Sequence, residues 1–157
     1  AMPMDAVRGL GVAENGLRTL AVFGLAVLTM QILLGGWVST NYAALACPDF
    51  PTCLGYWIPP ELSGIILNHF VHRLLAYVIT ITVLILLLSS YMIKGLRMFR
   101  KELLVLICLI VLQIALGVGV VQTKLNFAVT ALHLSIALLI LSLVLYTWFW
   151  GMEERYQ

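Results

Sequence analysis

Histidine is the residue type with the clearest potential for chemistry in this sequence, because its three histidines fall within long apolar stretches. Ionisable side chains inside a membrane are costly and usually have a function there. His72 precedes the charged Lys94 by 22 residues, and His133 precedes the charged Glu153 by 20 residues. At about 1.5 Å per residue, each histidine would lie roughly 30 Å from the inner end of its own helix. We therefore expect both histidines at nearly the same depth, close to the outer face of the membrane.

A pair of histidines matched in depth is a pattern that can bind haem. Two neutral imidazoles that face each other can coordinate haem iron from both sides, and helix bundles commonly hold cofactors between facing helices. The alternative is that each histidine lies at the membrane interface, with its ring among the lipid headgroups. The matched depth favours haem, with His72 and His133 as the iron ligands. Zinc is disfavoured, because it requires three or four ligands and no third helix residue is suitably placed.

Three further residues near this pair are candidates for the cofactor site. His69 lies three residues before His72, on nearly the same helix face. It could contact a haem propionate, a second ligand or water, and it is the candidate catalytic residue; the alternative is an exposed interfacial histidine. Arg73 could pair with a propionate, which we favour, or reach the membrane surface without a partner. Trp37 could line the pocket, although an aromatic belt at the interface also explains it.

The elements that must position these residues are predicted from composition. Hydrophobic residues make up 62% of the 157 residues and charged residues only 10%, whereas soluble proteins carry about 25% charge. A helix needs about 20 apolar residues to cross a bilayer, and in hydrocarbon it pairs its own backbone polar groups. We predict an all-α integral membrane four-helix bundle and no nucleic-acid partner, since no basic patch is present. The predicted helices cover about 19–39, 64–93, 103–123 and 125–150.

The distribution of lysine and arginine predicts the orientation of the bundle. Four of these residues lie between positions 94 and 101, whereas the loop 41–63 contains none. Cytoplasmic loops carry the excess of positive charge. We therefore expect a cell membrane protein, in the plasma or inner membrane, with 18–152 as the haem-binding transmembrane domain. The segments 1–17 and 153–157 would be cytoplasmic, and the loop 41–63 would lie outside.

The sequence also contains a weak internal repeat. Residues 31–38 read QILLGGWV and residues 113–120 read QIALGVGV, at corresponding positions in the first and third predicted helices. The second and fourth predicted helices each carry a histidine near the outer end. This pattern predicts two helix hairpins related by a pseudo-twofold axis along the membrane normal. We expect Gln31 and Gln113 to form hydrogen bonds between helices.

Two cysteines lie in the outer loop, in the sequence CPDFPTC from Cys47 to Cys53. Disulfides persist on the oxidising side of a membrane, and closing this loop would contribute roughly 2 kcal/mol in the chain-entropy model. A structural disulfide is the favoured interpretation. The alternative is a redox-active pair, although the spacing is not the Cys-x-x-Cys of thioredoxin-like proteins.

Several of these segments together resemble the haem A synthase family of cytochrome oxidase assembly proteins. The resemblance lies in LGGWVSTNYAALACPDFPTC at 34–53, in HFVHR at 69–73, in QIALG at 113–117 and in His133 with the leucine after it. It covers about residues 20–150 and is specific, because a long loop motif and both histidine helices match in order.

The resemblance implies a fold and a reaction. Members of the family usually have eight helices in two homologous halves, each with a histidine pair and an outer-loop cysteine pair. They convert haem O to haem A by oxidising a ring methyl to a formyl group, with substrate haem in one half and haem b in the other. It follows that His72 and His133 would be the axial ligands and that Cys47 and Cys53 would form the loop disulfide. Haem b is the expected cofactor, and haem O or haem A would be substrate or product.

The sequence departs from the family pattern in two respects. It has the length of one half, and His69 stands where the substrate-type half typically has a glutamate three residues before its histidine. Its loop and its His-x-x-His-Arg motif resemble the second, cofactor-type half. We expect a haem A synthase-like oxidoreductase that acts as a homo-oligomer or with a second four-helix half, among membrane lipid and oxidase assembly factors. The alternatives are a non-catalytic haem b carrier or electron-transfer subunit, and a haem-free scaffold for oxidase assembly.

Overall fold

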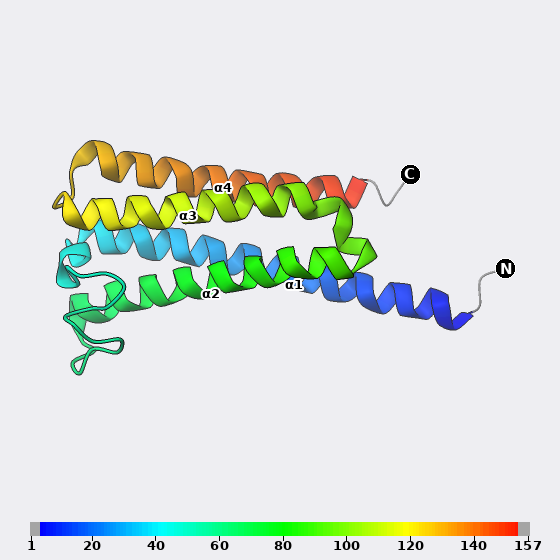
Figure 1. The fold of residues 1–157 in the computed structure, drawn as a ribbon, viewed down its shortest axis with the longest axis horizontal. Coiled ribbons are helices and arrows are strands. Elements are labelled where there is room, and N and C mark those ends of the chain that lie inside the picture. The colour runs from blue at the N-terminus through cyan, green and yellow to red at the C-terminus, as the bar shows by residue number, and fades with distance from the viewer. Residues whose placement is uncertain (1–3, 154–157) are drawn as a thin grey trace.

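A computed structural model describes residues 4–153, and these form a bundle of four long helices (Figure 1). The only β pairing in the described part is an isolated bridge between Cys53 and Tyr56. The prediction of an all-α fold is therefore confirmed. The helices are α1 (Met4–Thr40), η1 (Ala43–Ala46), α2 (Gly64–Met92), η2 (Lys94–Phe99), α3 (Arg100–Gln122) and α4 (Phe127–Glu153).

Four of the described segments are long and apolar enough to cross a membrane. Large apolar side chains are exposed along them, for example Leu33 at 70% and Leu88 at 59%. A surface of this kind is unfavourable in water but matches lipid tails. The chain is therefore an integral membrane protein, as predicted. The candidate spans are Val22–Thr40, Gly64–Met92, Leu96–Gln122 and Phe127–Thr147.

The helix bounds differ from the predicted ones mainly at the N-terminus. The predicted first helix began at residue 19, where the apolar run starts, but α1 begins at Met4. A helix can continue past the end of its apolar stretch, because its backbone hydrogen bonds do not depend on hydropathy. This N-terminal part of α1 extends beyond the other helices, on the same end of the bundle as the C-terminus and opposite the loop 41–63 (Figure 1).

The turn between α3 and α4 determines where His133 lies. Lys124 and Leu125 have φ angles of 53° and 65°, in the left-handed region. The backbone N–H of Leu125 donates to the carbonyl of Val120 at 2.8 Å, which closes the turn. The side-chain oxygen of Asn126 then accepts hydrogen bonds from the next helix's first N–H groups, at 3.0 and 3.4 Å. Asparagine favours this capping position, so α4 starts at a defined residue.

The centre of the bundle is a cluster with one buried residue from each long helix, namely Leu28, Val83, Ile110 and Ile140. In lipid this packing is held by van der Waals contacts rather than by exclusion of water. The cluster closes the middle of the bundle, and three of its residues, Leu28, Ile110 and Ile140, also line an open space on the side of the loop 41–63.

We predict that the outer loop and the 94–101 segment label from opposite sides of the membrane. In a Cys108→Ser background, a membrane-impermeant maleimide should react with the Glu61→Cys variant in intact cells, because the loop without Lys or Arg faces outward. The Lys101→Cys variant should react only after the membrane is permeabilised. Both parent side chains are exposed, so access alone does not distinguish them. The reverse pattern would show that the orientation is inverted.

Candidate functional site

A cavity of about 370 Å³ lies between the four helices, towards the ends that carry the loop 41–63. Small-molecule and cofactor sites usually have about 300–1,000 Å³. His72 from α2 and His133 from α4 both line it, so the structure brings the two predicted ligands to one space. The remaining lining is mostly apolar, and its other polar residues are Gln31, Ser39, Thr40, His69, Arg73, Tyr77, Gln113 and Thr130.

Each of these two histidine rings packs against a glycine of the preceding helix. A Cβ atom added at Gly35 would lie 3.0 Å from Cε1 of His72. A Cβ atom added at Gly117 would lie 3.2 Å from Cε1 of His133. By contrast, a Cβ atom at Gly36 would meet nothing within 4 Å. The corresponding contacts in the two hairpins match the repeat predicted from the sequence.

The two repeat-related glutamines differ in what they hold. The Gln31 side chain donates to the backbone carbonyl of His72, with a distance of 3.0 Å from Nε2 to the oxygen. Nε2 of Gln113 lies 3.3 Å from the ring Nε2 of His133. The predicted hydrogen bonds between helices are thus present at both positions. Gln31 fixes the backbone beside one histidine, whereas Gln113 contacts the ring of the other.

The imidazole nitrogens are only partly satisfied by the protein. Nδ1 of His72 and Nδ1 of His133 are both buried without a hydrogen-bond partner. Among the described contacts, the His72 ring forms no hydrogen bond at all. A buried polar group without a partner costs about 1–3 kcal/mol and calls for an explanation. Imidazoles of this kind, lining an apolar cavity, are suited to a ligand that carries a metal.

The donor set fits haem better than a metal held by protein alone. Within the described part of the chain, no group of three or more His, Cys, Asp or Glu could hold a metal ion. Two histidines are insufficient for a structural zinc site. They suffice for haem, because the porphyrin supplies the iron with its other nitrogen ligands. The residues present therefore fit haem.

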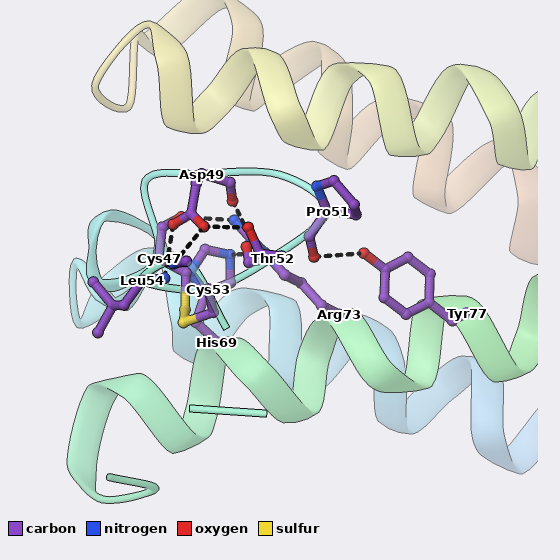
Figure 2. Close-up of a disulfide and its surroundings, with 10 residues drawn as sticks. Cys47, Asp49, Pro51, Thr52, Cys53, Leu54, His69, Arg73 and Tyr77 are labelled. Carbon is purple, nitrogen blue, oxygen red and sulfur yellow. Dashed lines mark hydrogen bonds between the residues drawn. A yellow bond between two sulfur atoms is a disulfide. The ribbon is translucent and has the colours of Figure 1, made fainter. Parts of the chain in front are cut away.

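Arg73 has partners other than those expected from the sequence. Its Nη1 donates to the carbonyls of Asp49 and Thr52, and its Nη2 to that of Cys47, each at 2.7 Å (Figure 2). Its Nε donates to Nε2 of His69 at 3.0 Å. Four of the five guanidinium N–H groups are thus used within the chain. The alternative of an unpartnered arginine was therefore wrong, whereas a propionate contact stays a prediction for the remaining N–H group.

His69 is also placed differently from the predictions. Its side chain is only 4% exposed, so it is not an exposed interfacial histidine. It lines the cavity, but the lone pair of its Nε2 accepts the hydrogen bond from Arg73. This nitrogen is held by a charged donor at 3.0 Å, whereas Nε2 of His133 has only a 3.3 Å contact with the neutral amide of Gln113. The sequence missed this pairing because it depends on the direction of the Arg73 side chain.

Trp37 does not line the cavity, which leaves the alternative of an aromatic belt. Its side chain is 58% exposed and is not part of the cavity lining, although its neighbours Gly36 and Val38 are. Successive residues point in directions about 100° apart around an α-helix. Trp37 is therefore turned towards the surroundings of the bundle, where an aromatic belt is expected.

The structure joins Cys47 and Cys53 in a disulfide, and both residues are buried. Inside this loop, the Asp49 carboxylate accepts hydrogen bonds from the hydroxyl of Thr52 and from the backbone N–H groups of Leu54 and Gly55 (Figure 2). These bonds, that of Thr52 foremost, lower the pKa of Asp49 to about 2. The sequence reasoning did not single out Asp49, although aspartate commonly organises turns in this way.

The fold and site define a class: a membrane four-helix bundle whose cavity is lined by histidines of its second and fourth long helices. Comparison with known proteins agrees with the class. Residues 8–145 match a family described as cytochrome oxidase assembly protein. The chain belongs to this family.

Similar curated proteins named heme A synthase come from several bacteria. The protein from Shewanella oneidensis is 34% identical over 158 aligned positions, which cover 86% of this chain and 47% of that protein. The protein from Halalkalibacterium halodurans is 34% identical over 133 positions, covering 81% and 42%. The protein from Nitrosospira multiformis is 31% identical over 153 positions, covering 88% and 43%. The chain spans about half the length of the curated relatives it matches.

We predict that Asp49 keeps the loop ordered down to mildly acidic pH. Its pKa lies below the ordinary 3.8, so the stabilisation is fully present above about pH 4 and is lost only as the pH falls towards 2. Hydrogen exchange of the Leu54 and Gly55 amides, corrected for intrinsic rates, should be equally slow at pH 7 and pH 5.

The Asp49→Asn variant should exchange at these amides about fivefold faster at both pH values, because it loses a charged acceptor. Glu61→Gln is the matched control, since Glu61 accepts a hydrogen bond only from Ser63 among the described contacts. An unchanged rate in Asp49→Asn would contradict the assigned role.

Proposed function

We propose that this chain binds one haem in the membrane, with His72 and His133 as the ligands of its iron. The observation that carries the proposal is that both rings line one cavity, each packed against a glycine of the neighbouring helix. Two further observations support it. Nδ1 of each ring lacks a hydrogen-bond partner, and the described residues include no group of three or more side chains that could hold a metal ion by themselves.

The residues of the chain would fix the haem and its surroundings. Haem supplies the redox chemistry of its iron once it is bound. Gln31 holds the backbone of His72, and the glycines leave room for the rings. The apolar side chains that surround the cavity, such as Leu28 and Ile110, would exclude water from the iron. A dry site of this kind strengthens the electrostatic interactions inside it.

We further propose that the chain takes part in haem A biosynthesis, as the haem b-holding half of a haem A synthase-type oxidoreductase. The relatives named heme A synthase support this assignment. The overall reaction would oxidise a methyl group of haem O to a formyl group. Because the chain spans about half of those relatives, the other half of the site would come from a second copy or from a substrate-type half.

A second candidate function is a haem b carrier or electron-transfer subunit that leaves its haem unmodified. It is favoured by the cavity lining, in which the structure places no Asp or Glu. His69, the remaining candidate for acid–base chemistry, has its Nε2 engaged by Arg73. A cavity lined in this way could bind a haem and set its reduction potential without supplying a proton-transfer group.

We expect the purified protein to show a low-spin haem spectrum, sharp in the dithionite-reduced form, that is lost in His72→Ala and His133→Ala. Each variant removes one of the two protein ligands of the iron. His69→Gln should keep the spectrum, because His69 is not a ligand and glutamine still offers an acceptor to Arg73. No haem in the wild-type protein after haem-replete expression would refute the proposal and leave the assembly-scaffold alternative.

We expect Gly35→Ala and Gly117→Ala to weaken haem binding by roughly tenfold or more. The added methyl groups would displace the imidazoles, and overpacking typically costs about 1–3 kcal/mol. Gly24→Ala is the matched control, since Gly24 lies in the same helix as Gly35, does not line the cavity, and its methyl group would meet nothing within 4 Å. Haem titration of the apoprotein measures the affinities. Equal affinities in Gly35→Ala and Gly24→Ala would show that the glycine contact is unimportant for binding.

The identity of the extracted haem separates the two functions. The protein should be expressed in cells that supply haem O, alone and together with a substrate-type half, and its haem identified by pyridine extraction. Haem A in the extract of either sample supports the synthase assignment. Haem b in both extracts, with haem O left unconverted, supports the carrier.

A further inference from the structure

The disulfide loop forms part of the wall of the cavity that the two histidines share. Phe50, in the middle of the loop, lines the cavity together with Ala44 from η1. The loop lies over the outer end of α2 (Figure 2). It is therefore placed between the cavity and the outer surface of the protein.

Four residues of the loop are held to α2 by two side chains of that helix. Arg73 donates to the carbonyls of Cys47, Asp49 and Thr52 at 2.7 Å each. One turn further along α2, the hydroxyl of Tyr77 donates to the carbonyl of Pro51 at 3.3 Å. Figure 2 shows both side chains reaching from the helix to the loop. Arg73 carries most of this attachment, since it makes three of the four bonds.

Arg73 directly follows His72 in the sequence. The residue that binds the loop, Arg73, is therefore the direct sequence neighbour of His72, a proposed iron ligand. The Nε bond of Arg73 to His69 fixes the plane of the guanidinium group. The ligand helix and the outer loop are thus linked as one unit by a single side chain.

We propose that Arg73 is a positioning residue that holds the Cys47–Cys53 loop, with Phe50, as the outer wall of the haem cavity. This inference rests on the proposed function where it concerns haem, but the attachment of the loop can be tested without haem. Arg73 acts through backbone carbonyls of the loop and not through the haem propionates. Phe50 then supplies the apolar contact that closes the cavity to small solutes.

The proposal depends on the shape of the arginine side chain as well as on its charge. A guanidinium group presents five donors in a planar fork, whereas an ammonium group concentrates three donors on one nitrogen. Lysine therefore cannot reach three carbonyls and one imidazole at the same time. Arg73→Lys should behave much like Arg73→Gln, although it retains the positive charge.

The first part of the test measures the loop in the haem-free protein. We expect amide hydrogen exchange of residues 47–56 to rise about fivefold or more in Arg73→Gln and Arg73→Lys, as expected for the loss of at least one net hydrogen bond. Exchange in α3 and α4 should not change. The matched control is Arg100→Gln, because Arg100 donates to the carbonyl of Ser90 at the other end of α2. Unchanged exchange of 47–56 in both Arg73 variants would overturn the proposal.

The second part measures access to the haem in the loaded protein. The rate at which added cyanide or imidazole replaces a histidine on the iron should rise in Arg73→Gln and in Phe50→Ala. Leu54→Ala is the matched control, because Leu54 is about as exposed as Phe50, at 46% against 47%, yet does not line the cavity. Phe50→Ala removes no side-chain hydrogen bond. It therefore still tests whether the loop closes the cavity if the Arg73 variants do not accumulate.

The two parts separate the possible failures. If the loop exchanges faster but haem access is unchanged in Arg73→Gln and Phe50→Ala, the claim that the loop closes the cavity is refuted. Equal access in Phe50→Ala and Leu54→Ala would also overturn it. A wild-type protein that binds no haem refutes the proposed function, and the exchange data then decide alone whether Arg73 holds the loop.

Discussion

The positions of both imidazoles depend on the absence of a side chain at Gly35 and Gly117. A Cβ atom at these positions would lie 3.0 or 3.2 Å from the ring, so a larger residue would push the ring aside by a few tenths of an ångström. In lipid such close approach is a main source of helix association. The direction in which His72 and His133 point, and therefore the cavity they share, follows from these two contacts.

The two hairpins use the same glycine contact but differ around it. In α2 the histidine is preceded three residues earlier by His69 and followed by Arg73, which connect it to the outer loop. In α4 the corresponding positions are Thr130 and Leu134. The first hairpin thus carries the polar attachment to the loop, and the second presents a simpler apolar surface. A pseudo-symmetric bundle can in this way place unlike surroundings on the two sides of one cavity.

The end of the bundle that carries the loop 41–63 shows how a charge at the end of a membrane helix is accommodated. Arg73 is partly buried, and it finds its partners in backbone carbonyls that the disulfide loop would otherwise leave without a donor. Asp49 organises the same loop from within by binding two of its N–H groups. The half-buried guanidinium group and the loop carbonyls thereby supply each other's hydrogen bonds, as buried polar groups generally require.

The sequence by itself determined the four membrane helices, since long apolar runs have one stable conformation in lipid. It also indicated that His72 and His133 share a depth, because the rise per residue of a helix is constant. Only the tertiary structure decided the partners of Arg73, the burial of His69 and the outward direction of Trp37. These depend on how helices rotate about their axes and where a distant loop folds back. Such contacts join residues more than 20 positions apart, for example Arg73 and Cys47, and no local pattern encodes them.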